Sequence, residues 1–181
     1  MNIGEEITAA YLRTIKMCDF IQLNLQTPDV QGETDVIGIN LTERKLYVCE
    51  VAVHLTSGLR YVRNRQPNTV VKLTEKFTRD IEYATKYFPD YNRHYMLWSP
   101  VVKTARDNSK ENQILFVETI RTNIRQKFNI EIEAVINQQF QDRLLELRTY
   151  AGRKTEELKS PVLRFLQIEE YLNAHIQRIT P

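Results

Sequence analysis

The stretch of residues 32–54 constrains the fold most, because it has the pattern of a β-hairpin that carries acidic residues. We expect its strands over residues 34–40 and 45–55, joined by a polar turn. Glu50 lies inside the apolar second strand, where a charged group is costly unless it is paired, hydrogen-bonded or bound to a metal. An antiparallel partner strand brings Asp35 close to Glu50. The hairpin therefore predicts a hard-oxygen site that is suited to Mg²⁺.

The residues around the two acids resemble the core motif of the PD-(D/E)xK nuclease superfamily. The matching strings are Gly32-Glu33-Thr34-Asp35-Val36-Ile37-Gly38 and Cys49-Glu50-Val51-Ala52-Val53. The pattern is most similar to small members such as Holliday-junction resolvases, and it covers roughly residues 3–100. The resemblance implies an α/β fold with a restriction-endonuclease-like core. In such a core a mixed central sheet is flanked by helices in the order αβββαβ, followed here by a helical C-terminal extension.

The same resemblance implies that Mg²⁺ or Mn²⁺ is the cofactor and that Asp35 and Glu50 are catalytic metal ligands. The backbone carbonyl of Val51 is a further expected ligand. Many small members also carry a glutamate on their first helix, which implies Glu6 as another ligand. The alternative is that Glu5 and Glu6 only complement the positive end of the helix dipole.

The family's lysine, two residues after the glutamate, is replaced here by Ala52. In some members this lysine stands on the following helix, which we expect over residues 69–88 with Thr69 as its cap. Lys72 and Lys76 lie near the start of that helix and are therefore candidate catalytic residues. The alternative is that both are ordinary surface lysines.

The loop of residues 55–69 is basic and leaves the strand that carries Glu50. Its arginines are placed to hold phosphates, and its tyrosine is placed to stack on a base. The alternative is a solvated basic loop without a ligand. The candidate nucleic-acid-binding residues are Arg60, Tyr61, Arg63 and Arg65.

Hydrophobic periodicity predicts the remaining elements. We expect helices over 3–16, from Asn108 or Ser109 to 128, over 139–158 and over 161–178, and strands over 18–26, 93–102 and 129–137. Residues 1–137 then form the nuclease-like core, and residues 138–181 form helices that pack on it or make a dimer surface. A homodimer would use Leu144, Leu145, Leu147, Leu163, Phe165 and Leu166.

Composition excludes few functions. The net charge of +2 is too small to establish a nucleic-acid partner by itself. No apolar run approaches the roughly 18 residues of a membrane span, so no membrane association is expected. Two cysteines without metal-ligand spacing fit a reducing, cytoplasmic compartment.

Three hypotheses for function follow. The first is a metal-dependent nuclease that hydrolyses DNA phosphodiesters. The second is a catalytically inactive module of the same fold that binds DNA or a protein partner, since Ala52 replaces the lysine. The third is a structural acid pair in an unrelated α/β protein, with a cation such as Arg60 bound to Glu50.

Overall fold

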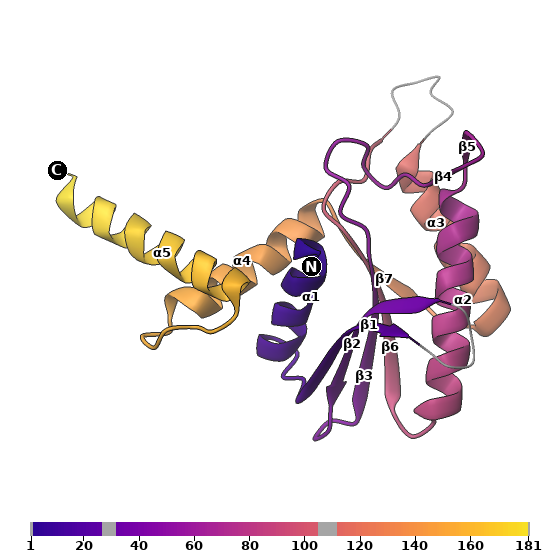
Figure 1. The fold of residues 1–181 in the computed structure, drawn as a ribbon, viewed down its shortest axis with the longest axis horizontal. Coiled ribbons are helices and arrows are strands. Elements are labelled where there is room, and N and C mark those ends of the chain that lie inside the picture. Colours follow the sequence, from indigo (N-terminus) through magenta and orange to yellow (C-terminus); the bar gives the residue numbers. More distant parts are fainter. Residues whose placement is uncertain (1, 27–31, 105–111, 181) are drawn as a thin grey trace.

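The computed structural model describes residues 2–26, 32–104 and 112–180 and has a five-stranded mixed sheet at its centre, with helices on both faces (Figure 1). The strands of this sheet lie in the order β1-β2-β3-β6-β7. Their bounds are β1 Phe20–Gln26, β2 Glu33–Asn40, β3 Lys45–Val51, β6 Asn92–Ser99 and β7 Ile132–Ile136. A small hairpin consists of β4 Val62–Arg63 and β5 Gln66–Pro67. The helices are α1 Ile3–Thr14, α2 Thr69–Tyr87, α3 Gln113–Phe128, α4 Gln138–Gly152 and α5 Pro161–Ile179.

The sheet is antiparallel on one side of β3 and parallel on the other. Strands β1, β2 and β3 form an antiparallel meander, whereas β6 pairs parallel to β3 and β7 pairs parallel to β6. Parallel strands of this kind are covered on both faces, which explains why Leu46–Val51 of β3 are all buried. The expected α/β class with a mixed sheet flanked by helices is confirmed, and the main helices and strands follow the expected order, but the hairpin β4–β5 lies within residues 55–69, which were expected to be a loop.

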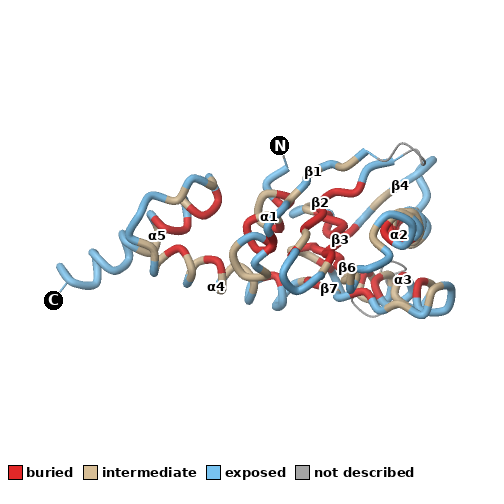
Figure 2. The backbone as a smooth tube through the Cα atoms, turned by 90° about the horizontal axis from the view of Figure 1, so that it is seen from below, coloured by how far each residue is buried: buried red, intermediate tan, exposed pale blue. Residues whose placement is uncertain are grey.

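Side chains of β3 alternate between two separate hydrophobic cores. Cys49 and Val51 join the core beneath α1 and α4, while Leu46 and Val48 join the core beneath α2 and α3. Figure 2 shows this buried centre and the exposed outer faces of the helices. Because neighbouring residues of a strand face opposite ways, Glu50 faces the α2 side of the sheet.

Several local expectations are wrong. Helix α4 ends at Gly152 rather than at residue 158. Strand β3 ends at Val51 rather than near residue 55. Helix α2 does start at Thr69, but the residue before it, Asn68, occupies the N-cap position without a side-chain cap hydrogen bond. The Thr69 hydroxyl instead accepts a hydrogen bond of 2.9 Å from the backbone N–H of Tyr61. Thr69 therefore fixes the basic loop against α2.

The C-terminal helices pack on the α1 side of the sheet, and α5 then extends away from the body (Figure 1). Three of the leucines expected at a dimer surface are instead buried within this chain, namely Leu147, Leu163 and Leu166. They are buried because they join the core beneath α1. Leu145 and Phe165 remain exposed.

Helix α3 begins at Gln113, and the side chain of Asn112 accepts hydrogen bonds from the first turn. The expected start at Asn108 or Ser109 lies outside the described residues. Within the described ranges, no helix combines the length and the apolar character needed to cross a membrane.

Candidate active site

The β2–β3 hairpin brings the two acids of the motif together. Val36 pairs with Cys49, and Asp35 and Glu50 occupy the next position along this register. Asp35 Oδ2 accepts a hydrogen bond of 2.7 Å from the backbone N–H of Val51. The carboxylate of Asp35 is therefore held at the carboxyl end of β3, against the residue that follows Glu50.

Helix α2 supplies a lysine to this pair of acids. Lys76 Nζ lies 3.0 Å from Asp35 Oδ1 and also forms an ion pair with Glu50 Oε2. The side chain of Glu50 is only 1% exposed and that of Lys76 is 16% exposed, so the ion pair is largely shielded from water. The expected relocation of a lysine to this helix thus agrees with the position of Lys76.

Asp80 is a fourth member of this cluster, and sequence reasoning missed it. Its Oδ1 accepts a hydrogen bond of 2.7 Å from the Thr34 hydroxyl, and its carboxyl group also interacts with Glu50. Asp80 lies four residues after Lys76, so both side chains project from one face of α2. The detectable signal was an acid adjacent to Phe77 and Ile81 on the apolar stripe of the helix.

The cluster of Asp35, Glu50, Lys76 and Asp80 holds more acid than base. Burial and the neighbouring carboxylates of Asp80 and Asp35 hold the pKa of Glu50 well above its usual range, although Lys76 opposes this shift. Burial also raises the pKa of Asp80, against hydrogen bonds from Glu50 and Thr34. Both shifts favour the protonated, neutral form of the carboxyl group.

Lys76 remains charged in this environment. Burial disfavours its ammonium group, but Glu50 and Asp35 outweigh burial and raise the pKa of Lys76 above its usual range. An amine that stays protonated cannot accept a proton as a general base at neutral pH. Lys76 is instead suited to stabilising negative charge.

The donor set fits a hard divalent cation. Both oxygens of Glu50 and Oδ2 of Asp80 are buried, and apart from each other and the Lys76 ammonium group they have no hydrogen-bond partner among the described residues. Carboxylate oxygens are the preferred ligands of Mg²⁺. Across the same described ranges, however, no three His, Cys, Asp or Glu side chains are already spaced to hold a metal. The Lys76 ammonium group lies against the carboxylates of Asp35 and Glu50, and it would have to move for a divalent cation to bind there.

The loop candidates lie beside this cluster rather than in it. Lys72 Nζ lies 4.0 Å from the centre of the Tyr61 ring, so this lysine points to the loop and not to the acids. His54 contacts the same ring edge-on at 5.4 Å. Burial raises the pKa of Tyr61, and the charges of Lys76, Asp35 and Glu50 also act on it. Tyr61 thus separates the basic loop from the acids.

The arginines of the loop face outward. Arg60, Arg63 and Arg65 are all exposed. Arg63 and Arg65 lie on the β4–β5 hairpin, where Asn64 and Arg65 both have positive φ, as a tight two-residue turn requires. This hairpin stands beside the start of α2 (Figure 1). The exposed arginines of the loop therefore lie at the surface and do not pair with the acids in the contacts described.

Of the two glutamates of α1, we expected Glu6 to be a metal ligand, but Glu5 is the more buried of the two. Glu5 is buried and accepts a hydrogen bond of 3.0 Å from Asn24 of β1, whereas Glu6 is only half-buried. No hydrogen bond or ion pair in the described part of the chain joins Glu6 to Asp35 or Glu50. Glu6 as a ligand stays a prediction, as does the carbonyl of Val51.

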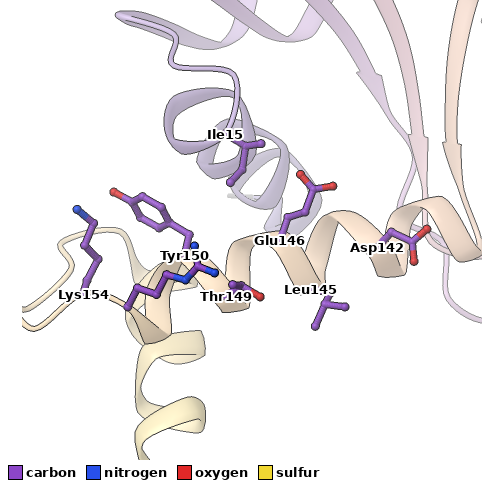
Figure 3. Close-up of a pocket in the computed structure, with 8 residues that line it drawn as sticks. Ile15, Asp142, Leu145, Glu146, Thr149, Tyr150 and Lys154 are labelled. Atoms are coloured by element: carbon purple, nitrogen blue, oxygen red, sulfur yellow. The ribbon is translucent and has the colours of Figure 1, made fainter.

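A cavity lies elsewhere, between the end of α1 and helix α4 (Figure 3). It has a volume of ≈ 730 Å³, and Ile15, Leu145, Glu146 and Tyr150 are among its lining residues. Helices α1 and α4 cover the opposite face of the sheet from α2. This cavity is therefore separate from the acid cluster.

Comparison with known proteins does not extend this description. No protein-family model and no curated protein matches the sequence, and no solved structure matches the chain.

Proposed function

We propose that this chain is a metal-dependent nuclease of the restriction-endonuclease-like type that hydrolyses DNA phosphodiesters. The observation that carries the proposal is the position of Lys76 Nζ, which contacts both Asp35 and Glu50. A nuclease of this type needs a cation beside its two acids, and α2 supplies it where Ala52 does not. The resemblance of the β2–β3 hairpin to the PD-(D/E)xK motif supports the same conclusion.

Asp35, Glu50 and Asp80 would hold Mg²⁺ or Mn²⁺ in this proposal. The bound cation would lower the pKa of a coordinated water and neutralise charge on the phosphate. Lys76 would stabilise the negative charge that develops on the phosphate oxygens, because its amine stays protonated. Arg60, Arg63 and Arg65 would contact neighbouring phosphates of the DNA backbone.

The ion pairs of Lys76 set a condition on this mechanism. The ammonium group of Lys76 must move away from the carboxylates before their oxygens can bind a divalent cation. A phosphate of the substrate is also negatively charged and could then pair with the ammonium group. Glu50 must also give up its proton, because a metal-binding carboxylate is ionised. We therefore expect metal affinity to rise with pH and with bound DNA.

A second candidate is a binding module of the same fold without catalysis. The specific observation in its favour is that Lys76 already forms ion pairs with Asp35 and Glu50, with no three-ligand group in place among the described residues. In this case the acid cluster serves stability, and the exposed arginines bind DNA or an acidic protein surface.

Titration calorimetry with Mg²⁺ and Mn²⁺ separates the two candidates. The chain is compared with Asp35→Asn and Glu50→Gln, and with Glu82→Gln as an exposed acid of the same helix. Each protein is tested with and without an uncleavable DNA duplex, and cleavage of branched, single-stranded and duplex DNA is assayed in parallel.

The nuclease proposal expects metal binding and cleavage in the chain and in Glu82→Gln, and loss of both in the other two variants. DNA binding without metal binding or cleavage would favour the binding module. Absence of both metal binding and DNA binding would contradict both candidates and leave the acids a purely structural role.

A further inference from the structure

The exposed face of α5 carries an apolar stripe that nothing within the described chain covers. The side chains of this stripe are between 45% and 67% exposed. They are Phe165, Ile168, Tyr171, Leu172, Ile176 and Ile179. A contiguous patch of large apolar side chains is unusual on a monomer and marks a surface of interaction.

The second half of α5 has little support from its own chain, and the hydroxyl of Tyr171 at its start donates a hydrogen bond of 2.9 Å to the Lys154 carbonyl. Val162, Leu163, Leu166 and Gln167 of its first half are buried, but every residue from Tyr171 to Ile179 is exposed. Figures 1 and 2 show this half reaching away from the body to the C-terminal end. Isolated helical segments of this length are marginal in water, because packing of an apolar face supplies most helical stability.

The spacing of the stripe makes it complementary to itself. Residues 165, 168, 172, 176 and 179 follow steps of three, four, four and three, which read the same from either end. Leu172 is the centre of this pattern. A two-fold axis through Leu172 would place each apolar residue of one helix against an apolar residue of the other, as an isologous interface requires.

The area is also sufficient for a dimer. If each of the six side chains offers on the order of 100 Å², about half of what a buried aromatic covers, two copies bury about 1,200 Å² together. This is the lower end of the range for specific interfaces. The side chains that hold α5 on α4 lie on a different side of the helix, so a second copy does not displace them.

From these observations we infer that the chain forms a homodimer in which the exposed stripes of two α5 helices pack against each other about Leu172. The interface differs from the leucine surface expected from sequence, since Leu147, Leu163 and Leu166 are internal. The stripe and the acid cluster lie on opposite sides of the sheet, so dimerisation is independent of the proposed nuclease activity.

Sedimentation equilibrium over a range of concentrations tests this inference with two matched variants. Leu172→Asp places two carboxylates at the centre of the interface, and Leu115→Asp changes a similarly exposed leucine on α3 (59% exposed against 53%). We expect a dimer for the unchanged chain and for Leu115→Asp. Leu172→Asp should weaken dimerisation on the order of 100-fold or more, since a buried leucine is lost from each copy.

A monomer at every concentration for the unchanged chain, or an undiminished dimer for Leu172→Asp, would overturn the inference. Circular dichroism of each variant shows whether the fold is retained, and Leu172→Glu provides a second variant if Leu172→Asp does not fold. Binding of a monomeric chain to phosphatidylglycerol vesicles, lost in Leu172→Asp, would assign the stripe to a lipid surface and also overturn the dimer.

Discussion

Replacing Lys76 with Met removes the only cation that the structure shows in contact with both Asp35 and Glu50 among the described residues. The methionine keeps most of the apolar length of the side chain but leaves buried carboxylates without a counter-charge. Breaking a buried ion pair by removing one partner costs about 3–5 kcal/mol. We expect a loss of that size in the free energy of unfolding at pH 8.

The loss should shrink as the pH falls. The pKa of Glu50 is already higher in the folded chain than in the unfolded chain. The free energy of unfolding therefore falls as the pH rises from the unfolded pKa of Glu50 to its folded pKa. Removing Lys76 raises that folded pKa further. At a pH between the folded pKa of Glu50 in the unchanged chain and that in Lys76→Met, the folded variant binds one more proton. In that range the loss in the free energy of unfolding shrinks by about 1.4 kcal/mol for each unit by which the pH falls.

Urea unfolding at pH 8 and pH 5 measures both effects, because Trp98 is the only tryptophan and lies fully buried in β6 beside β3. Lys72→Met is the matched control. Lys72 lies one turn earlier on α2 but contacts only the Tyr61 ring among the contacts described, so we expect a loss of at most about 1 kcal/mol without pH dependence. Equal losses for the two variants at pH 8, or a Lys76→Met loss unchanged at pH 5, would refute the buried-pair reasoning.

Two further changes test the surroundings of the cluster. Asp80→Asn should raise the free energy of unfolding at pH 8 by about 1 kcal/mol in urea unfolding, because a neutral amide replaces the carboxylate beside Glu50; a lower stability would contradict this. Gln113→Leu should lower it by about 2–4 kcal/mol, because the amide of Gln113 binds the backbone of Ser57, Leu59 and Lys103. Faster amide hydrogen exchange in the loop after β3 is the corresponding local signal, and unchanged exchange would show that other contacts hold this loop.

The hairpin and its acids could be predicted from the sequence because the pattern is local. Alternation along β2 and β3 fixes which side chains share a face, and a short turn fixes the pairing of Asp35 with Glu50. These inferences need only neighbours along the chain. The resemblance to the superfamily named Lys72 and Lys76 together as candidates on the following helix, and only the structure shows that Lys76 is the one that contacts the acids.

The parts that were missed depend on packing between distant segments. Asp80 was not identified because its role requires Thr34 and Glu50, which only the docked helix brings close. Thr69 was expected to cap α2, but its hydroxyl instead accepts a hydrogen bond from the backbone N–H of Tyr61 in the loop. Leu147, Leu163 and Leu166 were expected at a dimer surface but are buried within the chain, because the helical period alone does not say which face of a helix meets its neighbour.

The ion pairs of Lys76 also imply an order of assembly for the fold. Asp35 and Glu50 lie on strands joined by residues 41–44, so the two acids meet through contacts that are close in sequence and form early. Lys76 arrives only when α2 packs on the sheet. Until then both carboxylates remain hydrated, so the free-energy cost of dehydrating them arises when α2 docks on the sheet.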